Sequence, residues 1–171
     1  MYYNTHGFTL PELLTTLGIL TVLTSVGVPG TVQFIDNQQL VTTSNHLAAD
    51  LVLARSESIK RRQPVLVDNG DGNWQSGWQV YVDLNNNGLF EEGEPILRQA
   101  HSLPRNVIAK GNTPVRRYIR YTPSGSSHLI GGAFQAGTLF ICHANGKYAV
   151  RQLVVSATGR VRRHKAPPAP C

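Results

Sequence analysis

A run of basic residues near the end of the chain is the first group whose spacing suggests chemistry. Residues 159–165 read Gly-Arg-Val-Arg-Arg-His-Lys. In an extended backbone successive side chains point to opposite sides, so Arg160 and Arg162 share one side while Val161 packs on the other. Guanidinium groups donate paired hydrogen bonds to phosphate oxygens. The run therefore indicates binding of a polyanion, with Gly159 supplying a positive φ in the preceding turn. A solvated basic tail is the alternative.

The charge distribution favours the binding role. Residues 1–100 hold five Lys or Arg and ten Asp or Glu, a net charge of −5, whereas residues 101–171 hold eleven Lys or Arg and no acid, a net charge of +11. A surface of one sign attracts polyanions. Tyr118 and Tyr121 could stack on bases, and burial within a sheet is their alternative. Other cations could join the patch, and they are Arg163, Lys165, Arg116, Arg117, Arg120, Lys147 and Arg151.

A second group of polar residues follows the spacing of a calcium loop. Asp83, Asn85, Asn87 and Glu94 occupy positions one, three, five and twelve of that pattern, and Gly88 occupies position six. Strands are expected on both sides of the loop, where an EF-hand has helices. Asn and Gly at these spacings also make an ordinary hairpin turn. We therefore expect turn and capping roles and no metal, with weak calcium binding as the alternative.

No catalytic motif accompanies these groups. The sequence has no Gly-x-Ser-x-Gly, no His-Glu-x-x-His and no phosphate-binding glycine loop. Its six histidines show no metal-ligand spacing. We expect neither enzymatic activity nor a cofactor.

The N-terminal segment of the chain is apolar and could anchor it in a membrane. Residues 7–28 carry one charge, Glu12, and from Phe8 the segment has about 21 residues, enough to cross a hydrocarbon core of roughly 30 Å as a helix. The preceding residues are too few and too polar for a secretory signal, and no small-residue cleavage site follows, so we expect the apolar segment to be retained. Pro29-Gly30 is expected to bend or interrupt the helix.

The pattern then changes from helical to alternating. One face of an amphipathic helix steps by three or four residues through Leu40, Ser44, Leu47, Leu51, Ala54 and Ser58. About seven short strands follow, at residues 65–67, 78–82, 95–98, 107–108, 118–121, 138–142 and 149–156. Residues 166–170 are rich in proline and are expected to be extended. One long helix followed by many short strands predicts an α+β fold, with the helix laid on antiparallel sheet.

The start of the chain resembles the processing site of type IV prepilins and of type II secretion pseudopilins. Residues 7–10 read Gly-Phe-Thr-Leu, and residues 12–14 read Glu-Leu-Leu. The resemblance implies that a prepilin peptidase cleaves between Gly7 and Phe8 and methylates the new amine of Phe8. It also implies that Glu12 pairs with the N-terminal amine of a neighbouring subunit, which would answer the cost of a carboxylate in lipid.

The body is similar to the GspH/FimT group of minor pilins and pseudopilins, over residues 77–83, 85–88, 93–98, 151–156 and 159–162. The resemblance implies two antiparallel sheets packed against the helix. The expected organisation is a leader at residues 1–7, a transmembrane helix at 8–28, its amphipathic continuation at 29–62, a β-rich domain at 63–165 and a disulfide-stapled tail at 166–171.

The Gly-Arg-x-Arg sequence at residues 159–162 resembles the DNA-binding motif of FimT-type minor pilins, which act in DNA uptake during natural transformation. This implies sequence-independent binding to DNA phosphates, with the prepilin peptidase and other major and minor pilins as further partners. The alternative is a structural minor pilin or secretion pseudopilin that primes or caps the filament and docks an acidic neighbour.

The resemblance also implies a location. A single-pass protein of the inner membrane would place its C-terminal domain in the periplasm, and in the pilus at the cell surface after assembly. Disulfides persist in the periplasm, so we expect Cys142 and Cys171 to pair and to staple the last residue to an interior strand. Two free thiols are the alternative.

Overall fold

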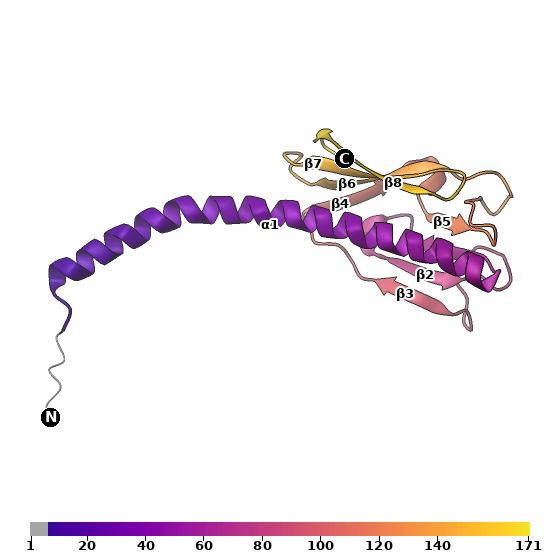
Figure 1. The fold of residues 1–171 in the computed structure, drawn as a ribbon, viewed down its shortest axis with the longest axis horizontal. Coiled ribbons are helices and arrows are strands. Elements are labelled where there is room, and N and C mark those ends of the chain that lie inside the picture. Colours follow the sequence, from indigo (N-terminus) through magenta and orange to yellow (C-terminus); the bar gives the residue numbers. More distant parts are fainter. Residues whose placement is uncertain (1–6) are drawn as a thin grey trace, which may run out of the picture. The chain divides into compact units, whose positions relative to one another are not determined.

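The computed structural model describes residues 7–171, apart from the side chains of residues 26, 28 and 29. Most of the expected leader, residues 1–6, lies outside the described residues. The chain divides into two compact units, Met1–Asp36 and Asn37–Cys171, which are described separately. Helix α1 spans Leu10–Arg61 and contributes to both units (Figure 1).

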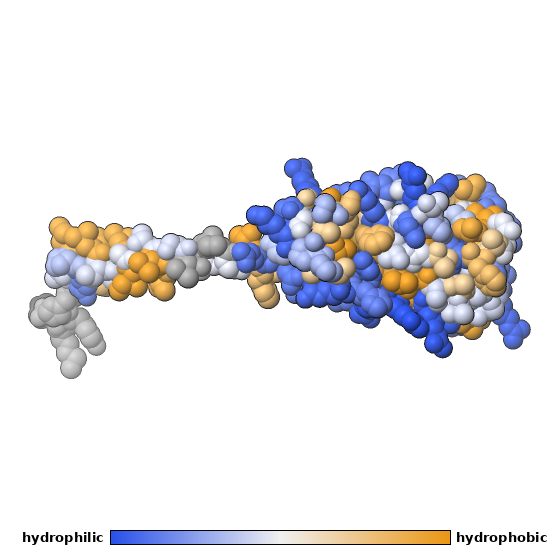
Figure 2. Space-filling model, turned by 90° about the horizontal axis from the view of Figure 1, so that it is seen from above, coloured by the Kyte–Doolittle hydropathy of each residue, from blue (hydrophilic) through white to orange (hydrophobic). Residues whose placement is uncertain are grey.

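The first unit exposes an apolar helix. This part of α1 is long and apolar enough to cross a membrane, with a mean hydropathy of 1.6 over its most apolar window. Apolar residues run along it (Figure 2). Its hydroxyl groups bond back to carbonyls of the preceding turn, as Thr16 does to Leu13 (2.9 Å) and Ser25 to Val22 (2.8 Å). Polar side chains satisfied within their own helix are compatible with lipid.

Of the two expected effects of Pro29-Gly30, a bend or an interruption, the interruption does not occur, because α1 is continuous from Leu10 to Arg61. A proline removes one backbone donor from the helical ladder, but the ladder resumes within a turn. In that turn the hydroxyl of Thr31 donates to the carbonyl of Gly27 (2.7 Å), which adds a hydrogen bond close to the missing one.

The second unit contains two four-stranded antiparallel sheets, as the α+β expectation required. Their strand orders are β3-β2-β1-β5 and β4-β6-β7-β8. The strands are β1 (Val65–Asp68), β2 (Trp78–Val82), β3 (Ile96–Ala100), β4 (Val107–Gly111), β5 (Tyr118–Tyr121), β6 (Gly137–His143), β7 (Ala149–Val155) and β8 (Val161–Pro168). Short 3₁₀ turns lie at Trp74–Ser76 and Thr113–Val115.

The C-terminal part of α1 packs against both sheets, and the hydrophobic core lies between them (Figure 1). The predicted helix face is confirmed, because all of its members are buried: Leu40, Ser44, Leu47, Leu51, Ala54 and Ser58. Burying a leucine side chain contributes about 1.5–3 kcal/mol to stability. Inward-facing residues of both sheets complete one continuous cluster, in which Val67 and Leu153 have no exposed surface.

The end of the chain is a strand and not a separate tail. Strand β8 continues to Pro168, and its residues Ala166 and Pro168 pair with Val150 and Ala149 of β7. Prolines are tolerated here because β8 is the outer strand of its sheet and needs no donors on its open side. The assignment of residues 166–168 to a tail is therefore wrong, although their extended conformation is confirmed.

The predicted disulfide is confirmed. Cys171 is bonded to Cys142 of β6, which lies 29 residues earlier in the chain. The Nζ atom of Lys110 on β4 also donates to the carbonyl of Cys171 (3.0 Å). The last residue is thus held to the interior of the second sheet.

Candidate nucleic-acid interface

The turn between β7 and β8 fixes where the basic run begins. Gly159 has a φ of +76°, as predicted, and its N–H donates to the carbonyl of Ser156 (2.8 Å). A Cβ at this position would lie 2.0 Å from the carbonyl oxygen of Gly125. The Nε of Arg55 donates to the same oxygen (2.9 Å). Gly159 therefore shapes a crowded turn, from which Arg160 emerges exposed.

Strand β8 divides the basic residues between its two faces. Val161 packs on the core, and Arg163 reaches α1 through a hydrogen bond from its Nη1 to Oδ1 of Asn45 (3.0 Å). Alternation along the strand places Lys165 on this face as well and Arg162 on the opposite face. The expected separation of Arg162 from Val161 stays a prediction; the same alternation puts Arg163 on the face opposite Arg162.

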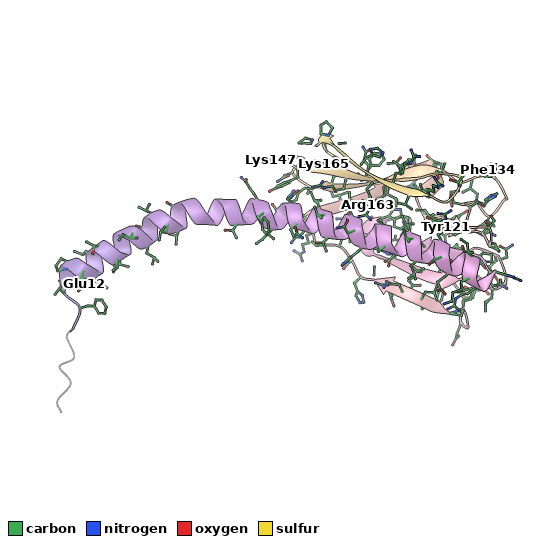
Figure 3. All side chains as sticks on the ribbon, viewed as in Figure 1. Glu12, Tyr121, Phe134, Lys147, Arg163 and Lys165 are labelled. Carbon is green, nitrogen blue, oxygen red and sulfur yellow. A yellow bond between two sulfur atoms is a disulfide. The ribbon has the colours of Figure 1, made fainter. Side chains whose placement is uncertain are left out.

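The charges of the basic run are not cancelled by acids. Arg160, Arg162, Arg163 and Lys165 are all exposed. Over residues 7–171, none of the four forms an ion pair with a carboxylate; the ion pairs of the fold lie elsewhere. Arg163 and Lys165 are labelled in Figure 3. All four therefore keep their positive charge, on both faces of the strand.

Two of the more distant cations lie on the same sheet. Arg151 of β7 pairs in register with Lys165 of β8, and its Nη2 donates to Oδ1 of Asn37 on α1 (3.0 Å). Lys147 is exposed in the turn that precedes β7. It therefore lies at the end of the β7–β8 pair where β8 finishes, and Figure 3 labels it.

The cations near β5 belong to the other sheet, and one of them is not accessible. Arg120 is only 7% exposed, and its Nη2 donates to Oδ1 of Asn86. The expectation that Arg120 widens the patch is wrong, because a buried and hydrogen-bonded guanidinium cannot reach a phosphate. Nε of Arg117 lies 3.9 Å from Oδ1 of Asp68, which offsets part of its charge, whereas Arg116 is exposed.

The two tyrosines of β5 are not stacking platforms. Tyr121 is buried, and burial raises the pKa of its hydroxyl. Tyr118 is half-buried, and its hydroxyl accepts the N–H of Ile130 (3.2 Å). Their alternative role within the sheet is confirmed. Phe134 is an aromatic side chain that is exposed, at 71%, and it packs on His128 with ring centroids 4.8 Å apart (Figure 3).

The loop at residues 83–94 is closed by its own side chains. The two carboxylate oxygens of buried Asp83 accept the N–H groups of Asn87 (3.1 Å) and Gly88 (2.9 Å). Oε1 of Glu94 accepts the N–H of Leu84 (2.9 Å). The amides of Asn85 and Asn87 donate to Glu91. These contacts confirm the turn and capping roles, and the described residues contain no cluster of three or more His, Cys, Asp or Glu suited to a metal ion.

Sequence reasoning missed the partners of the arginines on the helix side. Asn37 and Asn45 are ordinary polar residues of an amphipathic helix, and nothing in the basic run points to them. The signal that could have found them is their spacing of eight residues, which places both near one side of the helix. They meet Arg151 and Arg163 across more than a hundred residues of chain.

The architecture is shared with solved structures of two related classes of protein. The minor pilin FimU of Pseudomonas aeruginosa is 23% identical, with a TM-score of 0.59 over 80% of this chain and 98% of that chain. The minor pseudopilin EpsH of the Vibrio cholerae type II secretion system is 13% identical, with a TM-score of 0.56 over 74% of this chain and 97% of that chain. The fold is therefore that of minor pilins and pseudopilins.

The sequence identifies the family. The model of the family described as type II transport protein GspH matches residues 43–159, and this chain belongs to that family. Among curated proteins, none matches. The two structural neighbours are a minor pilin and a minor pseudopilin. The matched region ends at Gly159, so the cations of β8 lie beyond it, as do the apolar N-terminal residues.

Proposed function

We propose that this chain is a minor type IV pilin that binds DNA without sequence preference and contributes to DNA uptake in natural transformation. The observation that carries the proposal is that Arg160, directly before the outer strand β8, and Arg162, on that strand, are exposed with no acidic partner over residues 7–171. Gly159 holds the turn that presents them. Supporting cations are Arg163, Lys165, Arg151, Lys147, Arg116 and Arg117.

Contacts of this kind go to phosphates, so the binding is sensitive to salt. Neutralising roughly three to five phosphates gives a slope of log K against log salt of about −3 to −4. The affinity of one subunit is modest. Several subunits or other pilus proteins acting together raise it by multivalency.

The N-terminal part of the proposal concerns processing and assembly. A prepilin peptidase cleaves between Gly7 and Phe8 and methylates Phe8. The apolar helix at residues 8–28 then holds the chain in the inner membrane, with its second unit in the periplasm, until it joins other pilins in a filament. Glu12 lies exposed in the first turn of α1, and a carboxylate in lipid needs an opposite charge, which the N-terminal amine of a neighbouring subunit supplies.

The test is a double substitution, Arg160→Gln with Arg162→Gln, in the unit of residues 37–171. We expect salt-sensitive binding of labelled DNA to be lost while the melting temperature is unchanged, because both side chains are exposed. Arg105→Gln is the matched control, since Arg105 is an exposed arginine in the turn before β4. Equal DNA affinity in the double variant and in the control would remove the assignment.

A structural minor pilin or secretion pseudopilin that does not bind DNA is the second candidate function. The family description and the likeness of the fold to EpsH favour it. In that case the basic face docks an acidic subunit. The double variant would then impair filament assembly or secretion, and the unsubstituted protein would show no salt-sensitive binding to DNA.

A further inference from the structure

A cleft lies between the C-terminal part of α1 and strands β7 and β8 of the second sheet. It has a volume of about 190 Å³. It is lined by residues of the helix and of the sheet: Val41, Ser44, Asn45, Arg151, Arg163, His164 and Lys165. We propose that this cleft is a second phosphate-binding site, which seats one phosphodiester group of the DNA that Arg160 and Arg162 contact. The inference rests on the proposed function and adds a defined site to it.

Two asparagines hold the arginines of the cleft in place. Asn45 accepts from Arg163 (3.0 Å), and Asn37 accepts from Arg151 (3.0 Å). A neutral amide oxygen orients a guanidinium without cancelling its charge, whereas a carboxylate does both. Over residues 7–171 the arginines in ion pairs lie elsewhere: Arg61 with Glu57, Arg98 with Asp50 and Arg117 with Asp68. The cleft therefore keeps its positive charge while its arginines stay ordered.

One donor in the cleft is left without a partner. The Nε atom of Arg151 is buried and makes no hydrogen bond to any residue of the described chain. Burying a charged donor without an acceptor is unfavourable, so a negative charge in the cleft that Arg151 lines offsets part of this cost. Lys165, which pairs in register with Arg151, adds a third positive charge. The three groups together favour an anion with several acceptor oxygens.

The size of the cleft is suited to a phosphate. At about 30 Å³ for each water molecule in the liquid, 190 Å³ holds roughly six waters, or one tetrahedral oxyanion with a few waters around it. A duplex cannot enter such a space, but a phosphodiester group on its backbone can.

The position of β8 allows one DNA molecule to reach both sets of cations. Strand β8 is the outermost strand of the sheet order β4-β6-β7-β8, so its two faces meet at an open edge. At about 3.3 Å per residue, Arg162 and Lys165 lie roughly 10 Å apart along the strand. A nucleic-acid backbone that passes this edge can contact Arg162 on one face and the cleft on the other.

The test replaces the neutral acceptor of Arg163, the amide of Asn45, with a charged one. In Asn45→Asp the new carboxylate pairs with Arg163 and cancels its charge while leaving the side chain in place. Loss of one phosphate contact makes the slope of log K against log salt shallower by about 0.9, which corresponds to an affinity about 10- to 15-fold weaker at 50 mM salt. We would measure anisotropy of a labelled oligonucleotide of random sequence with the full chain in a non-ionic detergent. The melting temperature is expected to stay equal or to rise.

A matched control separates the cleft from a change in net charge. Asn73→Asp introduces the same charge at the exposed N-cap of the 3₁₀ turn Trp74–Ser76 in the first sheet region, where Asp caps as well as Asn. Its slope is expected to equal that of the unsubstituted chain. Arg163→Gln is a second variant, because it removes the same charge without depending on where a new carboxylate lies.

The outcomes distinguish the cleft from the proposed function. If Asn45→Asp and Arg163→Gln both bind DNA as the unsubstituted chain does, while Arg160→Gln with Arg162→Gln abolishes binding, the cleft inference alone is overturned. If the unsubstituted chain binds no DNA, the proposed function fails as well. Vesicles of phosphatidylglycerol are tested in parallel. If Asn45→Asp weakens binding to these vesicles but not to DNA, the cleft is a lipid-phosphate site and the inference is overturned.

Discussion

The carboxylate of Asp50 on α1 accepts a hydrogen bond of 2.8 Å from the indole Nε1 of Trp78 on β2, and both side chains are buried. The other oxygen of this carboxylate lies 3.4 Å from Nε of Arg98 on β3. A carboxylate is tolerated in a protein interior only where donors compensate for the lost water. This one has two, and it joins the helix to adjacent strands of the first sheet.

Removing that carboxylate should destabilise the domain. Asp50→Ala leaves the buried N–H of Trp78 without an acceptor, so we expect the free energy of unfolding to fall by about 2–3 kcal/mol. Urea denaturation of residues 37–171 measures this. Glu92→Ala, at an exposed loop position, is the control and should be neutral. A loss below about 0.5 kcal/mol in Asp50→Ala would mean that water or another group replaces the contact.

The turn before the basic run should not tolerate a side chain. Gly159→Ala combines a positive φ with a Cβ that would lie 2.0 Å from the carbonyl oxygen of Gly125, so we expect a loss of about 2 kcal/mol or more. Gly131→Ala is the matched control, because no atom lies within 4 Å of its added Cβ. The two variants are compared by thermal unfolding. Equal melting temperatures would show that the turn relaxes without cost.

The disulfide should stabilise the domain measurably. The disulfide closes a loop between residues that are 29 positions apart. Cys171→Ser removes this bond, and we expect the free energy of unfolding to fall by roughly 2–4 kcal/mol. A reductant should lower the stability of the unsubstituted protein by a similar amount and leave the variant unchanged. A reductant effect that persists in Cys171→Ser would have to come from something other than this bond.

The pH dependence of stability should contain a contribution from Asp68. Burial raises the pKa of this carboxyl above its ordinary value of 3.8, against the opposing hydrogen bond from Gly70 and the charge of Arg117. The folded state is therefore penalised as the carboxyl ionises, so this contribution to stability falls as pH rises from 3.8 through the raised folded pKa. Asp68→Asn removes the penalty and keeps an oxygen for the N–H of Gly70.

The measurement is the urea midpoint of both proteins from pH 3 to pH 7. The difference in favour of Asp68→Asn should grow as pH rises. A difference that is constant or that shrinks would show that the pair with Arg117 outweighs burial.

Much of the fold follows from periodicity. The spacing of Leu40, Leu47 and Leu51 marked the buried helix face, and alternation marked strand β2. These patterns are local, because a helix or a strand that faces one core repeats its apolar residues at its own period. The eighth strand was less visible, since Arg163, Lys165 and the prolines of β8 lack alternating hydrophobicity and only pairing with β7 orders them.

The candidate site was predictable in part. The basic run is visible in the sequence, and the positive φ of Gly159 was anticipated and observed. Burial of Arg120 was not, because its partner Asn86 lies 34 residues away and charge alone suggests exposure. The hydrogen bonds of Arg151 to Asn37 and of Arg163 to Asn45 were missed for the same reason. Each of these hydrogen bonds joins residues far apart in the chain, and the type of neither residue predicts the contact.

The bond between Cys142 and Cys171 has a mechanical consequence. A strand at the end of a chain ordinarily peels from its free terminus when it is pulled, one hydrogen bond at a time. Strand β8 has no such terminus, because the crowded turn at Gly159 secures its beginning and a covalent link secures the residues just past its end. Fraying of β8 from its C-terminal end is therefore blocked for as long as the bond to β6 is intact.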